Sequence, residues 1–195
     1  MVSLISYARH SEELNLLRNP VIAFAGQTLS TLLVSGGKDM QKQMNIAVSA
    51  DTETTKWYMS NVLRSLGVNI SLKSSEYIEA GDLLSEADYA LVIGDEALKV
   101  FSTKLRILLD IGSEFLRAFQ MLPLYAVSVS RVKEKEGDDA WIADAEQYKS
   151  ECAENLAARL GISPILAKRY YANVRFQQEK SISNTLSFVM NSVRK

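Results

Sequence analysis

Cysteine and histidine are almost absent from this chain of 195 residues, in which Cys152 is the one cysteine and His10 the one histidine. An internal disulfide needs two cysteines, and zinc sites or histidine metal clusters need several such ligands, so counting excludes all three. We expect no metal and no cofactor. Cys152 lies in the helical stretch AEQYKSECAENLAARLG, where we expect a small packing residue rather than a nucleophile.

The chain also lacks an excess of either charge and any long apolar run. It has 22 basic and 23 acidic residues and a formal net charge of -1, so we expect no nucleic-acid partner. No stretch approaches the roughly 20 apolar residues that span a bilayer, so we expect no membrane partner. The start MVSLISYARHSEEL has no basic n-region of a secretion signal. We therefore expect a cytoplasmic location.

The composition, with 47% hydrophobic and 23% charged residues, suits a globular protein with a sizeable core. Short apolar runs alternate with amphipathic stretches over the first two thirds, which indicates an α/β fold around a largely parallel sheet. A helix is expected over residues 53–66, with Gly67 as its stop. Strands are expected at residues 2–7, 21–24, 29–35, 45–49, 69–73, 89–93, 106–110 and 124–130.

The last third changes to a helical pattern after the charged loop RVKEKEGDD. Gly161 interrupts this pattern once, and Ser163 with Pro164 is typical of an N-cap followed by proline at the first helical position. We expect three helices, at about residues 139–160, 163–174 and 178–193.

The stretch SADTETTKW combines the end of an expected strand with the start of a helix. Asp51 or Thr52 is placed to cap this helix. The free N–H groups of its first turn, with the hydroxyls of Thr52, Thr54 and Thr55, favour binding of a small anionic carboxylate. An ordinary Asp/Thr cap without a ligand is the alternative interpretation.

The stretch GQTLSTLLVSG is the second candidate. Gly26 permits a close approach to the backbone, and the hydroxyl of Ser30 lies in an apolar run where it needs a hydrogen-bond partner. That partner is either a ligand or a neighbouring carbonyl.

The stretch ADYALVIGDEAL predicts a buried strand that turns into a helix at Gly94, with Asp95 as the helix cap rather than a catalytic base. Near the C-terminus, Tyr170, Tyr171 and Phe176 recur at helical spacing among basic residues. We expect these rings to pack on the sheet, although a nucleic-acid surface is the alternative.

Five stretches in order resemble one family. They are GQTLSTLLVS, IAVSADTETTKWYMSNVL, ADYALVIGDEAL, LLDIGSEFLRAFQMLPLYAVSVSR, and ISPILAKRYYANVRF followed by LSFVMNSV. Together they are similar to the chorismate dehydratase family of the futalosine route to menaquinone.

The resemblance implies a two-lobed α/β fold of the type II periplasmic-binding-protein class, with mixed, mostly parallel sheets and a helical C-terminus. Residues 1–30 and 126–195 are expected to form the first lobe, residues 31–125 the second, and the ligand to bind between them. The family removes water from chorismate to give an enolpyruvyl-oxy benzoate, without a metal or redox cofactor. By position, Ser30, Thr54 and Thr55 are expected to bind substrate carboxylates or hydroxyls.

Two departures from the family pattern stand out. The family opens with a strand, a helix and a strand that carry a Ser-Tyr-Leu-Asn motif, and we find no counterpart here, so an incomplete first lobe is expected. Glu53 also stands where the family commonly has arginine. No general base can be assigned from the residues.

These observations predict a truncated or divergent chorismate dehydratase-like protein of menaquinone biosynthesis. A partner polypeptide or a neighbouring subunit of a homo-oligomer is expected to supply the missing strand-helix-strand. A non-catalytic binding protein for a small carboxylate is the alternative, and a scaffold or oligomerisation module is a third.

Overall fold

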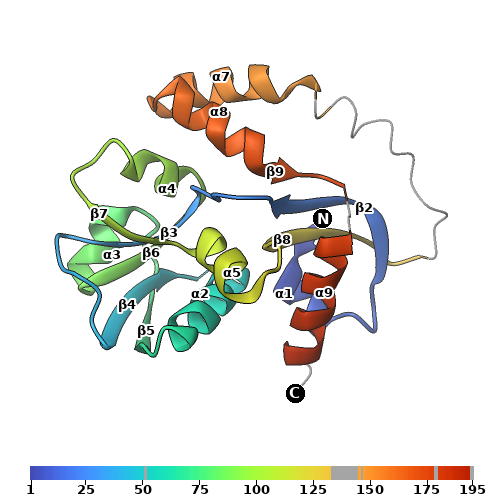
Figure 1. Cartoon of the computed structure of the whole chain (residues 1–195), viewed down its shortest axis with the longest axis horizontal. Helices are drawn as coiled ribbons and strands as arrows, with labels where there is room; N and C mark the ends of the chain where they lie inside the picture. Colours follow the sequence, from blue (N-terminus) through green and yellow to red (C-terminus); the bar gives the residue numbers. More distant parts are fainter. Residues whose placement is uncertain (51, 133–144, 146, 178–179, 194–195) are drawn as a thin grey trace.

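The computed structural model of the chain describes residues 1–50, 52–132, 145, 147–177 and 180–193 (Figure 1). The strands form two separate sheets. The four-stranded sheet has the order β1 (Val2–Ser3), β8 (Leu124–Ser130), β2 (Asn15–Phe24) and β9 (Val174–Arg175). The five-stranded sheet has the order β5 (Asn69–Ser75), β4 (Gln43–Ser49), β6 (Tyr89–Ile93), β3 (Thr31–Ser35) and β7 (Arg106–Asp110).

Strand direction differs between the two sheets. In the five-stranded sheet β4 is parallel to β5 and β6, while β3 is antiparallel to β6 and β7, so every strand except β3 runs the same way. In the four-stranded sheet every neighbouring pair is antiparallel. The expectation of mostly parallel strands is therefore correct for the five-stranded sheet and wrong for the four-stranded sheet. The chain reaches β3 from β2 of the four-stranded sheet, and β8 from β7 of the five-stranded sheet.

Helices cover both faces of the five-stranded sheet. One face packs against α2 (Glu53–Ser65) and α5 (Ile111–Phe119), and the other against α3 (Ala80–Glu86) and α4 (Gly94–Val100). Strand β3 is buried along its whole length, with Leu33 on the first face and Leu32 and Val34 on the second. Burial on both faces explains why this strand has a continuous apolar sequence.

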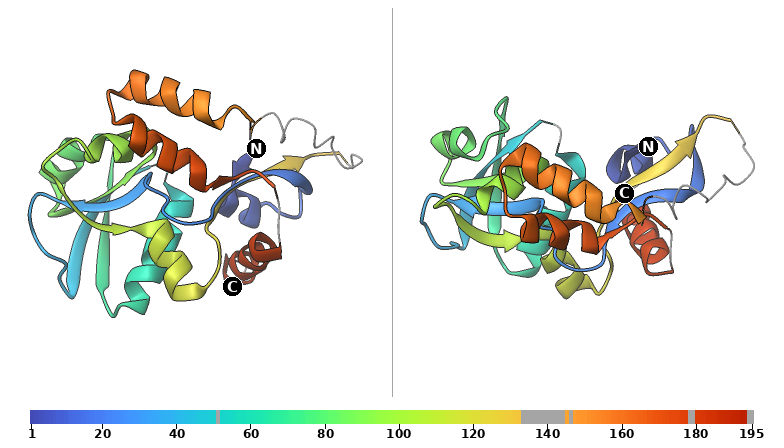
Figure 2. Two further views of the ribbon diagram at one scale, coloured as in Figure 1. Left: turned by 45° about the horizontal axis from the view of Figure 1, so that its top comes forward. Right: turned by 90° about the horizontal axis from the view of Figure 1, so that it is seen from above.

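The remaining helices belong to the two ends of the chain. Helices α1 (Leu4–Arg9) and α9 (Lys180–Val193) lie side by side next to the four-stranded sheet (Figure 1). Helices α7 (Lys149–Leu160) and α8 (Pro164–Asn173) pair as a hairpin on the other side of the molecule, as Figure 2 shows. Within the described residues, no helix is long and apolar enough to cross a membrane.

One hydrophobic core joins the two sheets. It contains Leu4 of α1, Val21 of β2, Leu33 of β3 and Phe115 of α5, each at most 2% exposed. The four-stranded sheet takes its strands from residues 2–24 and 124–175, and the five-stranded sheet from residues 31–110. The lobe boundaries expected at residues 30 and 125 stay a prediction.

The expected strand at residues 2–7 is wrong, because only Val2–Ser3 is a strand and a helix follows. The hydroxyl of Ser3 accepts a hydrogen bond from the backbone N–H of Ser6 at 3.1 Å and so caps α1. Leu4, Ile5, Tyr7 and Ala8 are buried, a spacing that fits one face of a helix. The expected strands at 89–93, 106–110 and 124–130 are confirmed.

The expected C-terminal helices correspond to α7, α8 and α9. Residues 139–144 and 146 of the first expected helix, and 178–179 of the last, lie outside the described residues. Ser163 caps α8 as expected, since its hydroxyl accepts from the N–H of Ile165 at 3.2 Å. Cys152 is exposed, so its interpretation as a packing residue is wrong; the neighbouring Ala153 faces the core instead.

Candidate ligand site between the two sheets

A pocket of about 380 Å³ lies where the two sheets meet. Its walls come from the start of α1, the start of α2 and the beginning of β8. The lining residues are Ser3, Ser6, Ala50, Thr52, Glu53, Thr54, Thr55 and Tyr125. The three threonines predicted from the sequence therefore share one pocket, and each is at most 6% exposed.

The three threonine hydroxyls differ in their partners. Thr52 donates to the carbonyl of Ser49 at 2.7 Å, and Thr54 accepts from the N–H of Ile5 at 3.3 Å. Among the residues that the structure describes, the Thr55 hydroxyl has no hydrogen-bond partner. Thr52 stands at the N-cap position of α2 without a side-chain cap bond, so its expected capping role is wrong. Asp51, the other expected cap, lies outside the described residues.

Glu53 is the charged residue of the pocket. Its carboxylate pairs with Arg9 of α1 at 2.8 Å and with Lys56 of α2. The hydrogen bond from Lys56, followed by that from Arg9, lowers the pKa of Glu53 against the opposing effect of burial. Glu53 therefore stays ionised, its charge is balanced by two cations, and it is a weak base. A ligand carboxylate meets little net repulsion here.

Gly26 and Ser30 lie outside the lining of this pocket. Gly26 has φ +154°, and a Cβ there would lie 2.7 Å from Oδ1 of Asn173 in α8, so the close approach is made by that side chain. The Ser30 hydroxyl lies close enough to the Tyr170 phenol to oppose the rise in its pKa, and the Ser30 carbonyl accepts from the N–H of Gly94 at 2.8 Å. Contact of Gly26 or Ser30 with a ligand stays a prediction.

Gly94 and Asp95 line a second pocket, of about 450 Å³, which shares Ala50 with the first. Gly94 has φ +63° at the turn from β6 into α4, a conformation that favours glycine. Asp95 lies in the first turn of α4 but makes no cap bond, so its expected role as a cap is wrong. Its carboxylate instead accepts a hydrogen bond from Arg159 of α7 at 2.7 Å.

Tyr170 packs as the ring spacing predicts. It is largely buried against Phe24 of β2, with 5.5 Å between ring centroids. Burial raises the pKa of its phenol.

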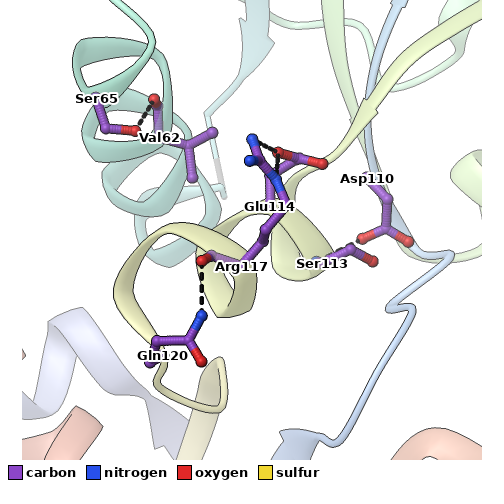
Figure 3. A network of polar contacts seen from close by, with 7 residues as sticks. All are labelled: Val62, Ser65, Asp110, Ser113, Glu114, Arg117 and Gln120. Atoms are coloured by element: carbon purple, nitrogen blue, oxygen red, sulfur yellow. Dashed lines mark hydrogen bonds and ion pairs between the residues drawn. The ribbon is translucent and has the colours of Figure 1, made fainter.

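Asp110 was not recognised in the sequence as part of this region. One carboxylate oxygen accepts from the N–H of Ser113 at 3.0 Å and caps α5, as Figure 3 shows, and the other accepts from the N–H of Leu29 at 2.7 Å. Leu29 has φ 61°, so this second bond holds a left-handed residue just before β3. An acidic residue directly before a helix was the available signal, whereas the bond to Leu29 spans 81 positions and had none.

Two tyrosines beside the pocket were also missed. Tyr58 of α2 donates to the carbonyl of Leu124 at 2.7 Å and accepts from its N–H at 2.9 Å. Tyr125 lies within hydrogen-bonding distance of Thr31, with 3.1 Å between their oxygens, and burial raises the pKa of its phenol. Both side chains therefore fix the start of β8 against neighbouring elements.

The pocket contains hydroxyl side chains, the start of helix α2 and one carboxylate that is paired with two cations. Within the described part of the chain, no group of three or more His, Cys, Asp or Glu side chains is arranged to hold a metal ion.

Residues 1–187 match the family model described as menaquinone biosynthesis. The chain belongs to this menaquinone biosynthesis family. None of the curated proteins matches it.

Three solved structures are similar to this family member. Protein AF1704 from Archaeoglobus fulgidus has 14% sequence identity and a TM-score of 0.64, over 98% of this chain and 76% of that one. The alkanesulfonate-binding protein SsuA from Xanthomonas axonopodis pv. citri, bound to MOPS, has 13% identity and a TM-score of 0.62, over 98% and 72%. The periplasmic aliphatic sulphonate binding protein SsuA from Escherichia coli has 11% identity and a TM-score of 0.59, over 98% and 67%.

At these identities the likeness establishes the fold. The menaquinone biosynthesis protein has the α/β fold of the type II periplasmic-binding-protein class, with mixed sheets and a helical C-terminus, which confirms the fold class expected from the sequence.

Proposed function

We propose that this protein acts as a chorismate dehydratase-like lyase of menaquinone biosynthesis, with chorismate bound in the pocket between the two sheets. The observation that carries the proposal is the hydroxyl-lined start of α2, buried in that pocket in a chain of this family. Hydroxyls and free N–H groups at a helix start suit a carboxylate, because they donate hydrogen bonds without adding a competing charge.

The proposed reaction is an elimination that balances as chorismate to an enolpyruvyl-oxy benzoate and water. One ring C–H bond and the ring C–O bond to the hydroxyl break, a ring double bond forms, and the proton and hydroxide leave as water. The role we give to Thr55, with the first N–H groups of α2, is to bind a substrate carboxylate and orient the ring. The lowered pKa of Glu53 argues against its use as the base.

Incubation of the purified protein with chorismate, followed by chromatography for the aromatic ether, tests the proposal. Product is expected with the wild type and with Thr103→Val, a control near the end of α4 whose hydroxyl bonds to the Val100 carbonyl. Thr55→Val is expected to form it more slowly, by about tenfold for one lost hydrogen bond to a charged group. Folded wild type without turnover would reject the catalytic role.

A non-catalytic carboxylate-binding protein is the second candidate. Two of the similar structures are named as sulfonate-binding proteins, and the charge-balanced Glu53 leaves the pocket without an evident base. Thermal-shift titration separates the two roles, because a ligand selective for the folded state raises the melting temperature whether or not it reacts. Stabilisation by chorismate without product favours binding alone.

We also propose that the protein assembles with a partner polypeptide or a second copy through the edge of strand β1. Strand β1 pairs only with β8 among the described residues, which leaves its other edge available to a strand from a partner polypeptide or a second copy. Light scattering is expected to show a species larger than the monomer when that partner is present. A compact monomer under every condition contradicts this part alone. The cytoplasmic location stays a prediction.

A further inference from the structure

A buried hydroxyl cluster lies behind the pocket and consists of Thr28, Thr31 and Tyr125. Thr28 is fully buried and Thr31 is 5% exposed. Tyr125 is the member that also lines the pocket. It comes from β8, so it faces the threonines of α2 from the side of the four-stranded sheet.

The cluster gathers against Gly112 at the start of α5. A Cβ at Gly112 would lie 1.7 Å from the Thr28 hydroxyl oxygen and 2.8 Å from the phenol oxygen of Tyr125. These contacts place both oxygens beside the same α-carbon, and only glycine leaves room for them.

The hydroxyl groups of this cluster are only partly paired among the described residues. Its three hydroxyls carry three protons, and Thr31 and Tyr125 share one well-formed hydrogen bond. Thr28 lies close enough to the phenol to oppose the rise in the pKa of Tyr125, but its hydroxyl forms no well-aligned hydrogen bond with any described residue. A buried donor without an acceptor is costly. Thr28 does not line the pocket, so a ligand there meets this cluster through Tyr125.

Tyr58, the tyrosine next to Tyr125, differs from it in how its hydroxyl is hydrogen-bonded. The rings of Tyr58 and Tyr125 are 5.4 Å apart, but the Tyr58 phenol both donates to and accepts from Leu124. If Thr31 donates to the Tyr125 oxygen, the Tyr125 proton is free to point at a ligand. Burial raises the pKa of this phenol, so it stays protonated at neutral pH.

We propose that Tyr125 determines ligand specificity by donating a hydrogen bond to a second carboxylate, while the start of α2 holds the first, so that the pocket selects dicarboxylates. This inference rests on the proposed function, because chorismate carries two carboxylates. The ligand would then be held by residues from both sheets at once.

Calorimetric titration of chorismate into wild type, Tyr125→Phe and Tyr58→Phe tests the inference, with melting temperatures measured without ligand. Tyr125→Phe keeps the ring but loses the one hydrogen bond to Thr31, so its affinity is expected to fall about tenfold or more while its melting temperature falls less than that of Tyr58→Phe. Tyr58→Phe is expected to lower the melting temperature and keep the affinity. A third variant, Thr31→Val, is expected to weaken binding less than Tyr125→Phe does.

Equal affinity of Tyr125→Phe and wild type would overturn the inference and leave the proposed function standing. The inference also fails if Tyr58→Phe loses as much affinity as Tyr125→Phe, since ring packing would then explain both losses. Wild type that is folded and binds no chorismate overturns the proposed function itself, together with the role of Tyr125.

Discussion

Adjacent threonines at the start of α2 have separate tasks at the residue scale. Thr54 accepts a hydrogen bond from Ile5 of α1, while Thr55 is unbonded among the described residues and faces the same pocket. The first hydroxyl serves the fold and the second is available to a ligand. A pattern of hydroxyls in the sequence shows neither assignment, because the partner of Thr54 lies 49 positions away.

Valine substitutions separate the two tasks while they conserve side-chain volume. Thr54→Val is expected to lower the free energy of unfolding by about 1–2 kcal/mol, since it leaves a buried N–H without a partner. Thr55→Val is expected to change it by no more than about 0.5 kcal/mol and to reduce stabilisation by chorismate. Chemical denaturation with and without chorismate measures both. Equal stability losses in the two variants would contradict this division.

At the scale of single elements, the sequence predicted the strands of the five-stranded sheet better than the opening of the chain. Strands β6 and β7 are apolar runs bounded by turns, and local pattern suffices for them. Residues 2–7 have an equally apolar pattern, but the cap at Ser3 turns them into a helix. A short apolar run is compatible with a strand and with a helix. The residues of α1 form a helix that is buried on one face, and this burial depends on contacts with α9 and β8, which lie far along the chain.

Helix α5 depends on Asp110, which caps its start (Figure 3). The same carboxylate also accepts from the N–H of Leu29. Asp110→Ala is expected to lower the free energy of unfolding by about 2–4 kcal/mol, because it removes a helix cap and leaves the Leu29 N–H without its acceptor. Asp110→Asn keeps one oxygen and is expected to lose about half as much. Urea denaturation of the three proteins measures this. An alanine variant as stable as wild type would show that neither bond matters.

For the whole molecule, contacts between distant segments explain both what the sequence predicted and what it missed. The α7–α8 hairpin lies against the crossing from β2 to β3, where the Asn173 side chain meets Gly26 and the Tyr170 phenol lies close to the Ser30 hydroxyl. The sequence pattern drew attention to Gly26 and Ser30, and their contact with a ligand stays a prediction. The pattern could not identify α8 as the source of their partners, since nothing local encodes that packing.

The pairing of Glu53 with Arg9 joins α1 to α2 across the two halves of the molecule. Because the folded-state pKa of Glu53 is lowered, mainly by Lys56, its contribution to stability is present above its ordinary value of 4.5 and is lost as pH falls through the folded pKa. The side chain is 39% exposed, so solvent screens the effect and keeps it small.

Glu53→Gln is therefore expected to be slightly less stable than wild type at neutral pH and to converge with it in acid. Thermal unfolding from pH 3 to pH 7 measures the difference. A difference that grows as the pH falls would contradict the assigned sign.

Direct titration of chorismate into the purified, folded protein tests the central claim most simply, because the catalytic role and the role of Tyr125 both depend on a ligand in the pocket between the sheets. We predict saturable binding at one site in wild type, weakened about tenfold in Thr55→Val and unchanged in Thr103→Val. No binding by folded wild-type protein, or equal binding by Thr55→Val, would contradict it.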